Sequence, residues 1–307
     1  MGDNGSSAIS IQSPPTATGR LACQNVTLLT RRKRRPRSKK IISIRTPAFR
    51  LLLCPGETQL WATPATGYSE GQLQAFLAEM DFSERTRADG FRFQRDRMRY
   101  IVTRCAIRSV LSRYTDHPPA AWSFMADAFG RPCLVKNESA ITGLTFNITH
   151  TSLMIVIALS RSDTVGVDAE SRERSAPSEV AERFFAASEN NALSQLTFEQ
   201  AAFRFFELWT LKEAYLKAIG VGLSVELNSI VFDFPNSYAI DYSSTSLDSC
   251  RDARQWTFSL FHLEPRHIFA LCLPAISEFR PLAFSLRIFA PLGDEKHRII
   301  SPYRWSR

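Results

Sequence analysis

The strongest pattern of hydrophobic and polar positions lies between Phe205 and Leu223, in FFELWTLKEAYLKAIGVGL. Apolar side chains recur there at steps of three and four residues, which is the period of one face of an α-helix. These apolar positions are Phe205, Leu208, Trp209, Leu216 and Ile219. Gly220 and Gly222 follow the last of them, as expected where a helix ends in a left-handed cap. The pattern therefore predicts one amphipathic helix that ends near Gly220.

Three charged side chains make this predicted helix a candidate for a functional site. Glu213 and Lys217 are four residues apart, on the shoulder of the apolar stripe. A solvated pair of this kind contributes only a few tenths of a kcal/mol, and taken alone the spacing favours that interpretation. Lys212 falls inside the stripe, where a charge is expected only if something binds it or its stem lets the ammonium reach water.

A second pattern runs from Thr164 to Glu170, in TVGVDAE, and predicts a β-strand. Alternation puts Asp168 and Glu170 on one face of that strand. Two neighbouring carboxylates repel each other, a divalent cation would relieve the repulsion, and oxygen ligands suit Mg²⁺. A strand whose outer face is simply acidic is the alternative, and a lone Asp-x-Glu pattern favours it.

Together, G-V-D-A-E and the later W-T-L-K-E-A-Y-L-K-A-I-G-V-G-L resemble the paired motifs of the 4′-phosphopantetheinyl transferase family. Enzymes of this family move the phosphopantetheine arm of coenzyme A onto a serine of a carrier protein. The resemblance extends over roughly Phe91 to Phe234. It implies an α+β fold of two similar halves in a pseudo-twofold arrangement, with the active site at their seam near Ser162–Thr164.

The resemblance also implies roles for the charged residues of the two motifs. Asp168, Glu170 and Glu213 would bind Mg²⁺, with coenzyme A as co-substrate and 3′,5′-ADP as the released product. Glu213 would act as the base, directly or through water, and Lys217 would contact the phosphates and stabilise the leaving group. Lys212 is a further candidate that would bind phosphate or serve the structure.

A basic segment, FRFQRDRMRY from Phe91 to Tyr100, resembles the family's arginine-bearing segment that contacts the 3′-phosphate of coenzyme A. Arg99 is the best positional match, and Arg92 and Arg95 are further candidates. A solvated start of a basic helix is the alternative. Arginines are locally unfavourable at a helix N-terminus, which already carries partial positive charge, unless an anion binds there.

Two more segments resemble family motifs that contact coenzyme A. Gly130-Arg131-Pro132 resembles Gly-Lys-Pro, with Arg131 in place of lysine, and either cation can hold a phosphate. The segment LTFNITHTS resembles F-N-x-S-H-S, so Thr149 and His150 are predicted contacts, with threonines at 149 and 151 in place of serines. Without the motif, a lone histidine at a strand edge is more often structural.

The expected organisation of the 307 residues has four parts. Residues 1–45 form a disordered basic tail, and residues 46–163 form the N-terminal half with the coenzyme A phosphate contacts. Residues 164–290 form the C-terminal half with the metal site and carrier docking, and residues 291–307 form a C-terminal tail. Carrier helices are acidic, so Arg183 in the C-terminal half is a candidate carrier contact.

Periodicity predicts the remaining elements. Expected helices cover Glu70–Met80 and part of Phe82–Tyr114, one or two helices cover Ala176–Leu196, and a polar loop covers Asn236–Asp252. Expected strands cover Phe49–Cys54, Leu60–Trp61, Leu153–Leu159, Ser229–Phe234, Trp256–His262, His267–Leu273 and Leu282–Ile288.

The net charge of +8 comes from one segment. Arg31 to Lys40 carries eight basic side chains and no acid, so the rest of the chain is formally neutral and gives no whole-surface argument for nucleic acid. The basic run could attract nucleic acid or anionic surfaces, could be an organelle-targeting segment, or could be an extension without function. The last of these is favoured, and nucleic-acid binding is expected only through this tail.

Other compositional features limit the setting. The six cysteines are scattered without a C-x-x-C pair, so a reducing, cytoplasmic location is the simplest expectation. No apolar run is long enough to span a bilayer. A chain that holds both halves of the site is expected to act as a monomer on an apo-acyl or peptidyl carrier protein, whose pathway the sequence does not specify.

Two other hypotheses remain open. Acidic strand residues with Glu-x-x-x-Lys and a basic tail could indicate a magnesium-dependent nuclease, although Lys217 lies a helix turn from its carboxylate rather than one strand step. A non-catalytic nucleic-acid-binding protein that uses Arg31–Lys40 is the other hypothesis.

Overall fold

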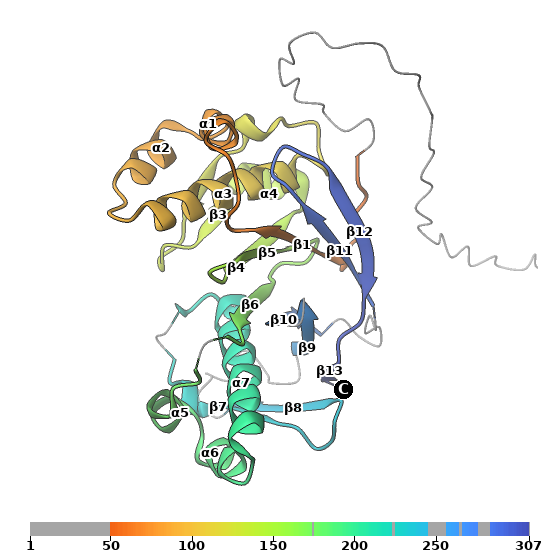
Figure 1. Cartoon of the computed structure of the whole chain (residues 1–307). Coiled ribbons are helices and arrows are strands. Elements are labelled where there is room, and N and C mark those ends of the chain that lie inside the picture. Colours follow the sequence, from red (N-terminus) through yellow and green to blue (C-terminus); the bar gives the residue numbers. More distant parts are fainter. Residues whose placement is uncertain are drawn as a thin grey trace, which may run out of the picture. The chain divides into compact units, whose positions relative to one another are not determined.

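The computed structural model describes residues 50–173, 175–222, 225–244, 256–263, 266–275 and 283–306. The predicted disordered tail, residues 1–45, lies outside the described residues. The fold is α+β, with two halves that each combine one large sheet with helices (Figure 1). The predicted fold class is therefore confirmed.

The first sheet belongs mainly to the N-terminal half and has the strand order β12-β11-β1-β5-β4. Its strands are β1 (Thr58–Pro64), β4 (Thr145–His150), β5 (Met154–Ser160), β11 (Phe284–Phe289) and β12 (Glu295–Ile300). Only β1 and β11 pair in parallel, and the other neighbours are antiparallel. The helical elements of this half are α1 (Glu70–Ala78), α2 (Phe82–Asp89), α3 (Gln94–Leu111), α4 (Lys136–Thr142) and the short η1 (Pro119–Ala121). A separate hairpin joins β2 (Phe124–Ala126) to β3 (Pro132–Leu134).

The second sheet has the strand order β6-β10-β9-β13-β8-β7. Its strands are β6 (Gly166–Ser171), β7 (Ile230–Asp233), β8 (Ala239–Ser244), β9 (Trp256–Leu263), β10 (His267–Pro274) and β13 (Arg304–Ser306). The helices of this half are α5 (Ser178–Phe184), α6 (Ala187–Ser194), the long α7 (Phe198–Ile219) and the short η3 (Leu227–Ser229).

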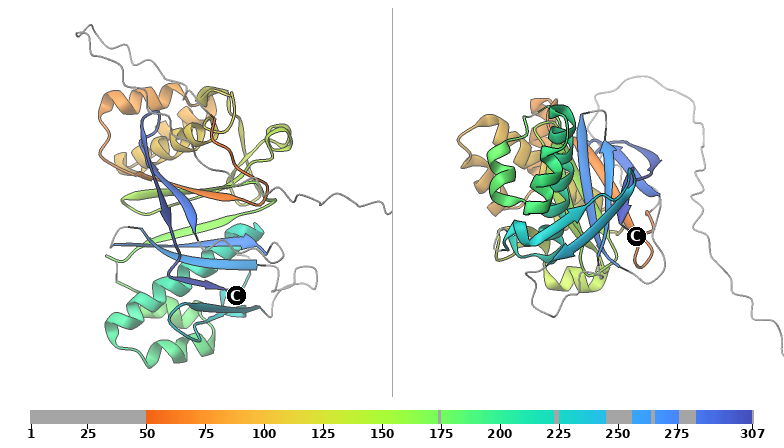
Figure 2. Two further views of the ribbon diagram at one scale, coloured as in Figure 1. Left: turned by 90° about the vertical axis from the view of Figure 1, so that its right-hand side faces the viewer. Right: turned by 90° about the horizontal axis from the view of Figure 1, so that it is seen from below.

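Alternating side chains stack these elements in four layers, helix–sheet–sheet–helix (Figure 2). In β1, Trp61 faces the cluster that contains α1 and α3, and its neighbour Leu60 faces the second sheet. In β10, Phe269 faces the first sheet, and its neighbour Ile268 packs in the cluster of α7. Each sheet is therefore covered on both faces. Because both faces are buried, most strands of the two sheets have nearly continuous apolar sequences.

Helix α7 confirms the strongest sequence pattern, with one difference at its start. The helix begins at Phe198 rather than Phe205, because Thr197 is its N-cap and forms a capping box with Gln200 in the first turn. It ends at Ile219, and Gly220 has the left-handed conformation, with φ 73°. That end was predicted from the glycine, because a residue with a Cβ rarely adopts this conformation.

Several segments differ from the expectations. Residues 50–54 are not a strand, and the expected loop over 236–252 contains β8 in its described part. The expected tail, residues 291–307, holds β12 and β13. β11 and β12 return to the first sheet, so this sheet combines strands from both sides of the expected boundary at residue 163. Four of the six β12 residues are exposed, so this edge strand carries little alternation of apolar and polar residues from which it could be predicted.

Candidate functional site

Strand β6 lies unusually close to helix α7 because Gly166 has no side chain. A Cβ built on Gly166 would lie 1.9 Å from the carbonyl oxygen of Ala214 and 2.9 Å from the Cβ of Ala218. Side chains at alternate positions share a face, so Asp168 and Glu170 point to the same side of β6 as Gly166. The close approach of the backbones thus brings both carboxylates next to the helix that carries Glu213 and Lys217.

Asp168 is the centre of the resulting polar cluster and is only 6% exposed. The Nζ of Lys217 lies 2.6 Å from its Oδ1 and also donates to the carbonyl oxygen of Val167 at 3.3 Å. The hydroxyl of Thr149, from β4, donates to the same Oδ1 at 3.0 Å. The ammonium of Lys217 is therefore paired with Asp168, on the neighbouring strand, rather than with Glu213 in the simple surface pair that the spacing favoured.

The charges of the other two predicted metal ligands, Asp168 and Glu170, affect the pKa of Glu213. Burial, followed by repulsion from Asp168 and from Glu170, raises the pKa of Glu213 to about 7, although Lys217 acts in the opposite direction. Among the described residues, no group of three or more His, Cys, Asp or Glu side chains is arranged to enclose a metal ion. Mg²⁺ usually keeps water and substrate phosphate oxygens in its shell and does not occupy a cage made by protein groups alone. A dication would relieve the repulsion that Asp168 and Glu170 exert on Glu213, and in this respect the three carboxylates suit the ion.

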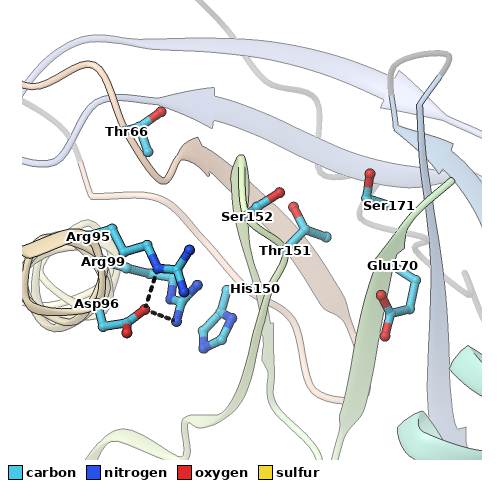
Figure 3. Close-up of a pocket in the computed structure, with 9 residues that line it drawn as sticks. All are labelled: Thr66, Arg95, Asp96, Arg99, His150, Thr151, Ser152, Glu170 and Ser171. Carbon is cyan, nitrogen blue, oxygen red and sulfur yellow. Dashed lines mark hydrogen bonds and ion pairs between the residues drawn. The ribbon is translucent and has the colours of Figure 1, made fainter. Parts of the chain in front are cut away.

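A cavity of about 420 Å³ opens beside this cluster (Figure 3). It is lined by Thr66, Arg95, Asp96, Arg99, His150, Thr151, Ser152, Glu170 and Ser171. Arg95 and Arg99 reach into it from the first turns of α3, and Glu170 lies across from them on β6. One cavity therefore has cations on the side of the N-terminal half and a carboxylate on the side of the C-terminal half.

The cationic side of the cavity is held in place by Asp96. Arg99 donates to Asp96 Oδ1 at 2.8 Å, and the Nε of Arg95 lies 3.8 Å from the same oxygen. Desolvation by the cavity walls, followed by the charge of Arg99, lowers the pKa of His150. A neutral imidazole beside two guanidinium groups can bind an anion without adding a third charge.

Two of the arginines predicted to contact phosphate lie outside this cavity. Arg92 is exposed, with its guanidinium 5.3 Å from the centre of the Phe93 ring. Arg131 bonds Asp127 through its Nε at 2.7 Å and also donates to the carbonyl oxygen of Lys217. Arg131 lines a different cavity of about 230 Å³, so the structure does not bring it together with Arg95 and Arg99.

Lys212, for which a phosphate-binding and a structural role were both open, is completely buried. Its ammonium lies 2.7 Å from Glu189 Oε2 and donates to the carbonyl oxygens of Leu227, at 2.9 Å, and of Ile230. A buried ammonium with a carboxylate and two carbonyl partners has its charge and hydrogen bonds satisfied within the protein. These contacts favour the structural alternative for Lys212, and they join α7 to α6, η3 and β7.

Several cavity residues were not predicted. Asp96 had a usable signal, because it is the one acid in FRFQRDRMRY and sits where repelling arginines need a counter-charge. Thr66 follows β1 and is far in sequence from every motif. Ser152 and Ser171 each follow a motif residue, and nothing in the sequence marks their hydroxyls as functional. Only the three-dimensional arrangement brings these hydroxyls to the cavity.

Comparison with protein families gives two adjacent matches. The family described as the 4′-phosphopantetheinyl transferase superfamily matches residues 164–272. The family described as 4′-phosphopantetheinyl transferase, N-terminal, matches residues 68–162. Together these two matches cover most of the described part of the chain and meet between β5 and β6.

Curated proteins with similar sequences carry related names. The 4′-phosphopantetheinyl transferase HetI of Nostoc sp. is 35% identical over 175 residues, which cover 57% of this chain and 73% of the relative. A phosphopantetheinyl transferase of Thraustochytrium sp. is 28% identical and covers 69% of this chain and 77% of its own. The 4′-phosphopantetheinyl transferase Sfp of Bacillus subtilis is 26% identical, and the match covers 58% of this chain and 81% of the relative.

Within the described residues, no helix is both long enough and apolar enough to cross a membrane.

Proposed function

Because this chain belongs to the 4′-phosphopantetheinyl transferase superfamily and is a transferase, we propose that it moves the 4′-phosphopantetheine of coenzyme A onto a carrier-protein serine. The observation that carries the proposal is the pairing of Lys217 with Asp168 beside Glu213, next to a cavity lined by Arg95 and Arg99. Carboxylates for a metal and cations for phosphates are the two kinds of group that a coenzyme A pyrophosphate and its 3′-phosphate require.

The reaction requires a base for the serine and stabilisation of the leaving group. The serine Oγ forms a bond to the β-phosphorus of coenzyme A, the bond from that phosphorus to 3′,5′-ADP breaks, and Glu213 accepts the serine proton directly or through water. Lys217 stabilises the negative charge that develops on the departing phosphate. Asp168, Glu170 and Glu213 would hold Mg²⁺, which when bound supplies Lewis-acid polarisation of the phosphate. Thr149 and Lys217 orient the Asp168 carboxylate for that task.

The carrier protein would approach the C-terminal half. A groove of about 410 Å³ is lined by Arg183, Phe184, Trp209 and residues 225–228. It combines an arginine with aromatic walls, which suits an acidic, amphipathic helix. We propose that an apo-acyl or peptidyl carrier protein binds there and that one copy of this chain carries the whole site.

The intact mass of an apo-acyl carrier protein, measured after incubation with this protein, coenzyme A and Mg²⁺, tests the proposal. The expected result is a gain of one phosphopantetheine group that EDTA prevents and added Mg²⁺ restores. Apo-peptidyl carrier protein, assayed in parallel, covers the second carrier class. If neither carrier gains mass, and coenzyme A with Mg²⁺ does not raise the thermal unfolding temperature, the proposed function is wrong.

Replacing Arg99 with Ala should raise the KM for coenzyme A about tenfold or more, because a hydrogen bond to a charged group contributes about 1.5–3 kcal/mol. With 3′-dephospho-coenzyme A the KM should change little, since that substrate lacks the phosphate that Arg99 would bind. Arg92→Ala is the matched control, because Arg92 belongs to the same basic segment but lies outside the cavity. Equal KM increases with both substrates would contradict the assignment of Arg99 to the 3′-phosphate.

A further inference from the structure

The geometry points to Arg131 as a positioning residue for Lys217 rather than a ligand of the coenzyme A phosphates. This inference rests on the proposed function, in which Lys217 stabilises the leaving group. Arg131 stands where the resembled motif has a lysine, and its position alone gave it a phosphate-binding role. In the structure its guanidinium is already engaged by two partners inside the protein, Asp127 and the carbonyl oxygen of Lys217.

Asp127 fixes the direction of the Arg131 side chain from within the turn of the β2–β3 hairpin. Its Oδ1 accepts the backbone N–H groups of Phe129 and Arg131, both at 2.9 Å. Its Oδ2 accepts the Nε of Arg131 at 2.7 Å, and its own backbone N–H donates to the carbonyl oxygen of Arg131 at 2.9 Å. The turn and the guanidinium are therefore held by one carboxylate, and the arginine is pre-organised before any substrate arrives.

The guanidinium meets α7 where the helix needs a donor. The last four carbonyl oxygens of a helix lack partners within the helix, and a cation there also interacts favourably with the helix dipole. Leu216 O accepts from the N–H of Gly220 at 2.9 Å, Lys217 O accepts from Arg131, and Ala218 O accepts from the hydroxyl of Thr164. A Cβ on Gly220 would lie 2.9 Å from Arg131 Nη2, so the guanidinium packs directly against the last turn.

The same residue, Lys217, is thus held at both ends. Arg131 holds its backbone carbonyl from the hairpin of the N-terminal half, and Asp168 holds its ammonium from β6 at 2.6 Å. The position of the ammonium over the leaving group then depends on a contact made outside the substrate cavity. A displacement of about 1 Å in a catalytic group can cost about 100-fold in rate, so loss of this contact should appear in kcat.

Removal of the Asp127 charge separates the two roles of Arg131 because they predict opposite results. Asp127→Asn keeps an Oδ1 acceptor for the turn but loses the charged partner of Arg131. A phosphate-binding Arg131, released from its ion pair, would bind coenzyme A more tightly in this variant. A positioning Arg131 would hold Lys217 less firmly, and kcat would fall.

The experiment compares kcat and KM of wild type, Asp127→Asn and Arg131→Gln, each with coenzyme A and with 3′-dephospho-coenzyme A. We expect kcat to fall about tenfold or more in Arg131→Gln, and by less in Asp127→Asn, with both substrates and with KM changed less than about twofold. The unfolding temperature identifies a variant that does not fold, in which case the other variant decides.

Three results would overturn the inference. One is a KM in Arg131→Gln that rises for coenzyme A but not for 3′-dephospho-coenzyme A. Another is a lower KM for coenzyme A in Asp127→Asn. The third is an unchanged kcat in the variants that fold. A wild-type protein that transfers nothing to either carrier class would overturn the proposed function, and the inference with it. This result differs from the three above because it appears in the wild type and not only in the variants.

Discussion

Glu213→Gln is expected to lower transfer at least about 100-fold, because general-base catalysis alone contributes about 10²–10⁴-fold. The substitution keeps the shape of the side chain but removes both its ability to accept the serine proton and one negative charge from the predicted metal site. The rate of mass gain of an apo-carrier protein at saturating coenzyme A and Mg²⁺ measures the effect. Glu199→Gln, an exposed position in the first turn of the same helix, is the matched control and should retain normal turnover.

The stability of Glu213→Gln should change in the opposite direction to its activity. Burial and the neighbouring carboxylates raise the pKa of Glu213 to about 7. Ionisation of this side chain is therefore less favourable in the folded state than in the unfolded state, and it lowers the free energy of unfolding. The sign follows: the stability of the metal-free wild type falls as the pH rises from the unfolded pKa of a glutamate through about 7, and the neutral amide avoids this loss. In EDTA at pH values above 7, the variant should unfold at the same temperature as wild type or higher. Near-normal turnover in a folded variant would contradict the roles assigned to Glu213.

The long helix and the paired carboxylates were predictable because each depends on local spacing. Asp168 and Glu170 share a strand face by alternation, and the end of α7 follows from Gly220. That Asp168 pairs with Lys217 across the β6–α7 contact could not be read from spacing, because it depends on how closely two separate elements approach. Gly166 was visible in the motif, but its consequence appears only when the helix lies against it.

The contacts of two charged residues were not predicted from the motifs, and the reason is the same for both. Lys212 and Arg131 both belong to or resemble functional motifs, yet the protein itself supplies acceptors for both. Those acceptors are a glutamate and carbonyl oxygens from α6, η3 and β7 in one case, and an aspartate and the end of α7 in the other. The buried ammonium of Lys212 requires such partners, and the half-buried guanidinium of Arg131 also has them, but their positions in the sequence are set by the fold and not by the motif.

Gly166→Ala is expected to damage stability and activity together. A Cβ at this position would lie 1.9 Å from the Ala214 carbonyl oxygen and 2.7 Å from the Ala218 amide nitrogen, and both are backbone atoms that cannot rotate away. Strand and helix must separate, and overpacking of this kind costs about 1–3 kcal/mol or more. The separation also draws Asp168 away from Lys217, so a folded variant should lose about 100-fold in kcat. Thermal unfolding and carrier mass gain measure the two effects.

Gly71→Ala is the control that isolates the close approach from the loss of a glycine. Gly71 lies in the first turn of α1, and a Cβ there would meet no atom within 4 Å. Alanine favours a helix over glycine by about 0.5–1 kcal/mol, so this variant should be as stable as wild type or more stable, with unchanged turnover. If Gly166→Ala matched Gly71→Ala in unfolding temperature and kcat, a Cβ would fit between β6 and α7. The contact between Asp168 and Lys217 would then not depend on a glycine at position 166. The opposite outcomes are expected because only at Gly166 does the backbone of a second element occupy the space that a Cβ needs.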